Sequence, residues 1–227
     1  QYYLVNQNMT INEFKVMYYW EHIHRILGRI LGLLFLLPFL YIFLKKIVNS
    51  EYNKNLFILF LLILLQGTVG WYMVKSGLVD NTTVSHYRLA IHLNLALILF
   101  SAIFWYFLNI KSKKNKFFFE FKMNNMFSKV FIFLIFLQIT FGAFTSGLDA
   151  GKIYQTWPLM NNYFFPDDIS FENLALSQIL NEPSIVQFLH RKLAYIIFIY
   201  VLLMSFFIFL KRRKNMYKAT YFLLSKI

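Results

Sequence analysis

Five long apolar stretches dominate this sequence and restrict what it can fold into. A helix that crosses the hydrocarbon core of a bilayer needs about 20 predominantly apolar residues. Stretches of that kind cover approximately residues 22–44, 56–74, 87–110, 129–147 and 185–210. With 59% hydrophobic residues and a mean hydropathy of +0.52, the composition is also more apolar than that of soluble domains. The sequence therefore predicts an all-α, polytopic transmembrane helical bundle with about five spans.

The charged residues alternate between connectors, which predicts how the chain crosses the membrane. Most of the 23 lysine and arginine residues lie in three connectors, residues 45–54, 111–129 and 211–218. Acidic residues gather instead in the N-terminal arm, in residues 75–86 and in residues 148–184. Because basic connectors stay on the cytoplasmic side, we expect the N-terminal arm outside and the C-terminus inside. The net charge of +13 then reflects topology in a lipid membrane, and no nucleic-acid partner is expected.

The composition excludes several classes of site. The sequence has no cysteine, which excludes disulfides, thiolate metal sites and cysteine nucleophiles. It has no Walker or Rossmann glycine pattern, so no dinucleotide cofactor is expected. The N-terminus shows no signal peptide and residue 1 is Gln, so we expect a processed chain or a piece of a longer one.

A weak internal repeat links distant helices. The segment QGTVG (66–70), followed by SGL, resembles QITFG (138–142), which is also followed by SGL. The pattern E-x-x-H-R at 21–25 likewise resembles Q-x-x-H-R at 187–191. Duplicated helical bundles place their sites between helices or halves, so we expect a site near the repeated polar residues.

Three histidines are candidate haem ligands. His24, His92 and His190 each lie within the first turn or two of a predicted helix that runs from outside to inside. At about 1.5 Å per residue they have similar depth, as axial ligation of a flat macrocycle requires. The alternative is that each histidine only bonds a neighbour or a lipid headgroup. His22 and His86 lie further out, in watery surroundings, and are expected not to be ligands.

Charged neighbours accompany these histidines. Guanidinium groups near an interface can bind haem propionates, although snorkelling towards lipid phosphate explains any single arginine equally well. The candidate propionate contacts are Arg25, Arg29, Arg88 and Arg191. Glu21 shares a helical face with His24, where it could donate or accept a proton or orient the imidazole. Its alternative role is a favourable charge near the positive end of the helix dipole.

Two further features have structural alternatives. Gly28 and Gly32 form a small-residue face below His24, which would admit a macrocycle or simply another helix. Residues 148–168 are rich in aromatic and turn residues. This segment either covers the site as a cap or forms an ordinary interfacial loop.

Five sequence blocks together resemble haem A synthase, of the type found in alphaproteobacteria and mitochondria. The resemblance runs from about Leu4 to Lys211. The blocks are NMTINEFKVMYYWEHIHRILGR, GWYMVKSGL (70–78), VSHYRLAIHL (84–93), GLDAGKIYQTWPLM (147–160) and VQFLHRKLAY (186–195). The lack of cysteine agrees with this type, because the bacillus-type members have paired cysteines.

The resemblance implies an enzyme that converts haem O to haem A by oxidising a ring methyl to a formyl group for cytochrome oxidase. It implies an eight-helix bundle of two four-helix halves, each with a histidine pair for one haem. Glu21 matches the essential glutamate of the family, His24 and His92 match the pair for substrate haem, and His190 matches a ligand of the cofactor haem b. The metal expected at these histidines is haem iron.

The resemblance also implies location, partners and domain division. It places the chain in a bacterial inner membrane or the mitochondrial inner membrane, with haem O synthase and cytochrome oxidase assembly factors as partners. The electron donor stays unidentified, and a homo-oligomer stays open. Residues 1–110 correspond to a first-half bundle with the outer arm and three spans, and residues 111–227 to an incomplete second half.

The matching blocks begin at the second helix of the family and end after the sixth. We therefore expect a fragment that lacks the first and the last two helices, including the partner of His190, and that is inactive alone if those helices are needed. Two other functions remain open at this point. One is a bis-histidine membrane cytochrome b that only carries electrons, and the other is a non-catalytic membrane protein for oxidase assembly.

Overall fold

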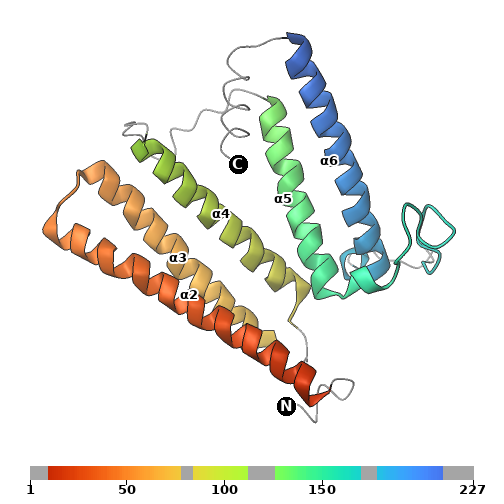
Figure 1. Cartoon of the computed structure of the whole chain (residues 1–227), viewed down its shortest axis with the longest axis horizontal. Coiled ribbons are helices and arrows are strands. Elements are labelled where there is room, and N and C mark those ends of the chain that lie inside the picture. Colours follow the sequence, from red (N-terminus) through yellow and green to blue (C-terminus); the bar gives the residue numbers. More distant parts are fainter. Residues whose placement is uncertain (1–9, 78–83, 112–125, 170–177, 212–227) are drawn as a thin grey trace. The chain divides into compact units, whose positions relative to one another are not determined.

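The computed structural model describes residues 10–77, 84–111, 126–169 and 178–211 of the 227-residue chain. It consists of five long helices, two short 3-10 turns and the loops between them (Figure 1). The long helices are α2 (Ile11–Lys45), α3 (Ser50–Gly77), α4 (His86–Lys111), α5 (Met126–Gly147) and α6 (Pro183–Lys211). The short turns are η2 (Ala150–Lys152) and η4 (Ile179–Asn181).

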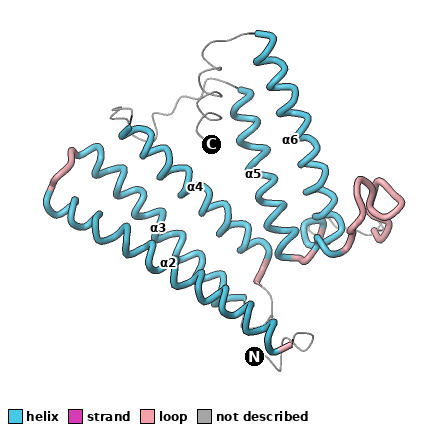
Figure 2. The backbone as a smooth tube through the Cα atoms, viewed as in Figure 1, coloured by secondary structure: helices cyan, strands magenta, loops and turns pink. Residues whose placement is uncertain are grey.

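The predicted fold class is confirmed. All five long helices are long and apolar enough to cross a membrane. Figure 2 shows helices joined by loops, and the described residues contain no strand beyond one isolated bridge between Met160 and Tyr163. Most apolar side chains on the helices are exposed, as expected for surfaces that face lipid. The protein is therefore a multi-pass helical membrane protein.

The first helix begins much earlier than its hydropathy indicates. Thr10 and Glu13 form a capping box: the Thr10 hydroxyl accepts from the Glu13 N–H at 3.3 Å, and the Glu13 carboxylate accepts from the Thr10 N–H at 2.8 Å. The end of the predicted N-terminal arm is consequently helical.

His24 lies more than three turns into α2, so its prediction as a first- or second-turn residue was wrong. His92 and His190 do lie in the second turn of α4 and α6.

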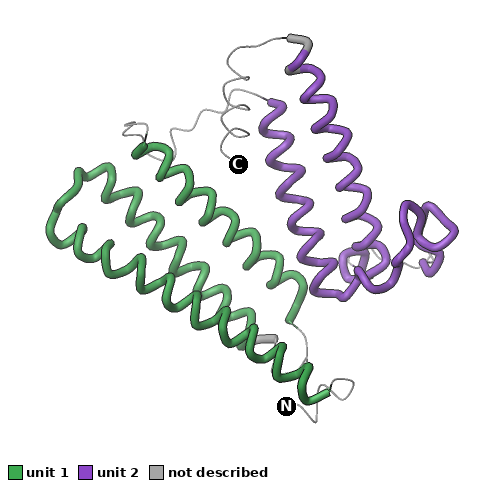
Figure 3. The backbone as a smooth tube through the Cα atoms, viewed as in Figure 1, with its two compact units in different colours: residues 1–121 green, residues 122–227 purple. Residues whose placement is uncertain are grey.

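The chain divides into two compact units, residues 1–121 and 122–227 (Figure 3). In the first unit α3 packs against both α2 and α4. Phe39 of α2 is 5% exposed and stacks on Phe60 of α3, with ring centroids 5.0 Å apart. These aromatic contacts hold α2 to α3 near one end of the pair.

The second unit has its most buried residues at the end of α6 that begins at Pro183. There α6 packs on α5, on η2 and on η4. Ala150, Tyr154, Met160 and Val186 are all at most 2% exposed. The 148–169 loop therefore has three buried residues, Ala150, Tyr154 and Met160, while most of its other residues are exposed.

Candidate functional site

His92 is held against α3 by a glutamine and a glycine. The amide nitrogen of Gln66 lies 3.3 Å from each ring nitrogen of His92 and donates to the His92 carbonyl at 3.2 Å. One turn further along α3, a Cβ on Gly70 would lie only 2.8 Å from His92 Cε1. Gly70 is therefore required for the imidazole to lie this close to α3.

His190 has the same surroundings in the second unit. The amide nitrogen of Gln138 lies 3.2 Å and 3.4 Å from the two ring nitrogens of His190. A Cβ on Gly142 would lie 3.3 Å from His190 Cε1. A second Gln-His-Gly arrangement thus joins α5 to α6.

These two arrangements explain the sequence repeat. The repeated segments QGTVG and QITFG place a glutamine and a glycine four residues apart, on one helical face. In both units that face meets the histidine of the following helix. Sequence reasoning identified the repeat but did not assign Gln66 and Gln138 to the sites. Their Oε1 atoms are both buried and find no hydrogen-bond partner among the described residues.

His24 lies on an exposed part of α2. It belongs to the same compact unit as His92, the histidine that the sequence predicts as its partner. Gly28 and Gly32 follow on the same helix, where a Cβ on either would meet no atom within 4 Å. Among the described residues no neighbouring helix requires these two glycines.

Glu21 pairs with Arg25, one turn further along α2. The two side chains are 42% and 41% exposed, so this pair is solvent-accessible or lipid-accessible rather than buried. The Glu21 carboxylate is thus directed towards Arg25, the neighbour of His24 in the sequence. The ion pair fixes the carboxylate without enclosing it.

The remaining candidate arginines differ in their contacts. Arg88 lies over the ring of Tyr72, 5.1 Å from its centroid, which is a cation–π contact between α4 and α3. Arg29 is exposed on α2. Arg191 is the most engaged, because its two terminal nitrogens donate to the carbonyls of Thr156 and Tyr154, at 2.8 Å and 2.5 Å.

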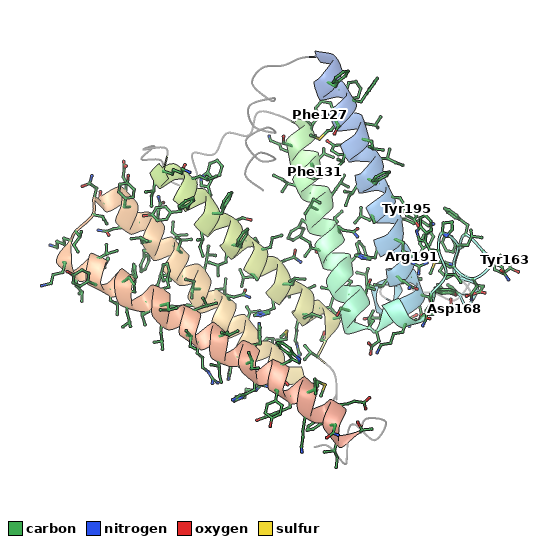
Figure 4. The ribbon with its side chains drawn as sticks, viewed as in Figure 1. Phe127, Phe131, Tyr163, Asp168, Arg191 and Tyr195 are labelled. Carbon is green, nitrogen blue, oxygen red and sulfur yellow. The ribbon has the colours of Figure 1, made fainter. Side chains whose placement is uncertain are left out.

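Arg191 belongs to a set of residues that fasten the 148–169 loop to α6. Figure 4 shows Arg191 on the side of α6 that faces the loop. Gln187, one turn earlier, donates to the Tyr154 carbonyl at 2.9 Å and accepts from the Tyr154 N–H at 3.3 Å. The Q-x-x-H-R pattern therefore holds the loop with its glutamine and arginine, while the histidine between them contacts α5.

The side chain of Tyr154 anchors the other end of this loop. Its hydroxyl lies 2.6 Å from an Asp167 oxygen and 2.8 Å from an Asp168 oxygen. Ser184 of α6 donates to Asp168 at 2.5 Å. Burial, together with the two carboxylates, raises the pKa of Tyr154, and the hydrogen bond from Tyr154 lowers the pKa of Asp167. These hydrogen bonds hold the loop against α6. The sequence left open whether the loop covers the site as a cap or is an ordinary interfacial loop.

A cavity of about 290 Å³ lies beside His190, between the ends of α5 and α6 and the start of the loop. Its lining includes His190, Gly142, Asp149 and Lys152. Lys152 and Asp149 are both exposed and form an ion pair at 2.7 Å. The cavity therefore combines an imidazole that could bind a metal with polar and charged groups at its rim.

The two histidines expected to be bystanders have different surroundings. His22 is exposed and stacks on Tyr18, with ring centroids 5.9 Å apart. His86 is only 8% exposed and packs on Tyr87 at 4.0 Å, so its expected watery surroundings were wrong. It begins α4, where it is covered by the packing of this unit.

The residues present fit haem as the group to be bound. Each unit offers an imidazole held by a neighbouring helix, with a glycine that leaves room beside the ring and a buried amide oxygen with no described partner. Histidine nitrogen is a common axial ligand of haem iron. The His24 and His92 side chains could bind one iron, and His190 could provide one ligand to a second.

Comparison with known proteins shows similarity to curated haem A synthases. The chain is 46% identical over 212 residues to the haem A synthase of Pelagibacter ubique, a match that covers 93% of this chain and 62% of that protein. It is 43% identical over 198 residues to the haem A synthase of Ehrlichia canis, with 87% and 56% covered. It is 40% identical over 203 residues to that of Nitrosospira multiformis, with 88% and 57% covered. The chain therefore spans about three-fifths of the length of these curated relatives.

No solved structure matches the chain. The family COX15-CtaA, described as cytochrome oxidase assembly protein, matches residues 1–226. With relatives above 40% identity over most of the chain, this match confirms the resemblance to haem A synthase. The chain belongs to the COX15-CtaA family of cytochrome oxidase assembly proteins.

Proposed function

We propose that this chain is the haem-binding core of a haem A synthase, which oxidises a ring methyl of haem O to a formyl group and so supplies haem A to cytochrome oxidase. The observation that carries the proposal is that one compact unit contains His24, with Glu21 one turn before it, and His92, whose ring Gln66 contacts. The similarity to curated haem A synthases supports the same activity.

In this proposal the residues of the first unit hold the substrate. His24 and His92 bind the iron of haem O, and Glu21 is the catalytic carboxylate that takes or gives a proton at the methyl being oxidised. Arg25 holds the Glu21 carboxylate in place through their ion pair. Arg29 and Arg88 provide positive charge for the propionates.

The second unit holds the cofactor. His190 is one ligand of a haem b, and this haem supplies electron transfer when it is bound. Arg191 acts near this site mainly through the 148–169 loop, which it fastens to α6. The N–H groups of Arg191 that these two bonds do not use are the donors for a propionate.

The proposal includes a cellular setting. The chain lies in a bacterial inner membrane or the mitochondrial inner membrane, with its N-terminal arm outside and its C-terminus inside. Its partners are membrane lipid, a haem O synthase that delivers the substrate and cytochrome oxidase assembly factors that receive the product. A homo-oligomer is compatible with the exposed apolar faces of the helices.

One observation favours a second candidate, a membrane cytochrome b that only carries electrons. The two Gln-His-Gly arrangements are nearly the same, as expected if both imidazoles served haems with one common task. Such a cytochrome needs no carboxylate beside a ligand. Glu21 therefore separates the two functions.

The test replaces Glu21→Gln in a strain that has no other haem A-forming activity. We expect the variant to keep its bound haem and its bis-histidine spectrum but to leave haem O unconverted. Glu51→Gln, in the first turn of α3, is the matched control and should convert haem O normally. Unimpaired conversion by Glu21→Gln would refute the catalytic role of Glu21. Wild-type protein that purifies without a Soret band would instead favour the non-catalytic assembly protein.

A further inference from the structure

The two glutamines against the histidines have no role in the function proposed above. Both lie on the helix that precedes the candidate ligand, and both place an amide nitrogen 3.2 to 3.4 Å from the ring nitrogens. Both leave a buried Oε1 atom without a described partner. A buried acceptor that stays unpaired costs free energy, so the same unpaired atom in two copies calls for a physical reason.

The chemistry of imidazole provides that reason. A neutral imidazole has one N–H and one lone pair, and the glutamine amide can donate to the lone pair. Iron takes the lone pair when a haem is bound, and the ring then offers only its N–H. Histidines that bind metals nearly always donate this second N–H to an acceptor, which fixes the ring and raises its basicity. A turn of the imidazole towards the glutamine, together with a flip of the amide, would bring the unpaired oxygen to that N–H.

We propose that Gln66 is a positioning residue for the iron ligand His92, with its side-chain oxygen accepting the ring N–H that iron does not use. Gln138 has the same role at His190, where its amide nitrogen lies at similar distances from the ring. This inference rests on the proposed function only in assigning iron to these histidines.

Gly70 supports the same geometry. Without a side chain on Gly70, the His92 ring can lie against α3 within reach of Gln66, one turn earlier. A ring pushed away from α3 would lose both the donor and the acceptor of the amide. The glycine and the glutamine thus form one support for a single imidazole.

The experiment uses the protein in a His190→Ala background, so that added haemin reports on the His24 and His92 site alone. Haemin affinity and the midpoint potential of the bound haem are measured for three changes. Gln66→Leu removes the acceptor oxygen. Gln66→Glu keeps a side chain of the same length, and its carboxyl group has an oxygen that can accept from His92 whether or not it is protonated. Thr68→Val is the matched control, because the Thr68 hydroxyl donates within α3 to the Leu64 carbonyl at 2.8 Å and lies on a different face of the helix from Gln66.

We expect Gln66→Leu to bind haemin about 10-fold or more weakly and to raise the midpoint potential, because a less electron-rich imidazole stabilises ferric iron less. Gln66→Glu should retain most of the affinity and should not raise the potential. Thr68→Val should match the parent protein. The corresponding change Gln138→Leu, tested at His190 with His92→Ala, should have an effect comparable to that of Gln66→Leu.

Two results would overturn the inference. One is an unchanged affinity and potential in Gln66→Leu, and the other is a loss in Gln66→Glu as large as that in Gln66→Leu. Haem A formation is measured separately, by haem extraction from membranes that carry the wild-type protein. A protein that shows the predicted shifts but makes no haem A would refute the proposed function and leave the role of Gln66 intact.

Discussion

Replacing Gly70 by Ala tests whether the close approach of His92 to α3 is required for haem binding. The new Cβ would lie 2.8 Å from His92 Cε1, whereas ordinary contacts begin near 3.4 Å, so the ring must move by at least about 0.6 Å. Overpacking of this kind costs about 1–3 kcal/mol. Alanine also favours a helix interior by up to about 1 kcal/mol over glycine. The net loss of folding stability should therefore be small, about 0–2 kcal/mol.

Haem binding should respond much more strongly than stability. A displaced imidazole cannot keep its bond to iron and its contact with Gln66 together, so we expect haemin affinity at the His24 and His92 site to fall about 10-fold or more. The assay is a haemin titration followed by the Soret band, with thermal unfolding in detergent measured on the same samples.

The chain provides two matched controls for this change. A Cβ on Gly67, in the same helix, would meet nothing within 4 Å, so Gly67→Ala should raise stability slightly and leave haem binding unchanged. Gly142→Ala, with its Cβ 3.3 Å from His190, should show an intermediate effect at the second site. The reasoning is refuted if Gly70→Ala binds haemin as tightly as Gly67→Ala.

Two further predictions concern the 148–169 loop. Arg191→Lys should speed tryptic cleavage after Lys152 several-fold, because an ammonium cannot span the two carbonyls that the guanidinium bridges. Cleavage at the wild-type rate would contradict this prediction. The hydrogen bond from Tyr154 lowers the pKa of Asp167 in the folded protein. This bond should therefore stabilise the loop fully at any pH above the ordinary aspartate pKa of about 3.9. The stabilisation should be lost as the pH falls through the lowered pKa. Fluorescence of Trp157, in a variant with no other tryptophan, should follow this acid transition, and Asp167→Asn should abolish it.

Hydropathy located the spans well because apolar length is a direct requirement of the bilayer. It placed the start of α2 eleven residues too late, since hydropathy does not report where helical hydrogen bonds begin. The capping pattern Thr10-x-x-Glu13 was the local signal for the true start. The depth argument for His24 depended on that start.

The sequence singled out the histidines as candidate ligands, but it did not identify the residues that contact them. The repeat of QGTVG and QITFG was visible in the sequence, yet a sequence does not show which face of α3 meets α4. Only the packing reveals that Gln66 and Gly70 both contact His92. Arg191 is a similar case. Its position next to His190 suggested a propionate contact, and nothing in the sequence indicates that carbonyls of the 148–169 loop accept its hydrogen bonds.

The most direct test of the central claim is chromatography of the haem extracted from membranes. The membranes come from a strain that makes haem O, has no other haem A synthase and expresses this protein, with a full-length relative as the positive reference. We predict that haem A appears in the extract and that it is absent when His92 is replaced by Ala. An extract that contains only haem O, from membranes in which the protein is present with haem bound, would contradict the proposed function.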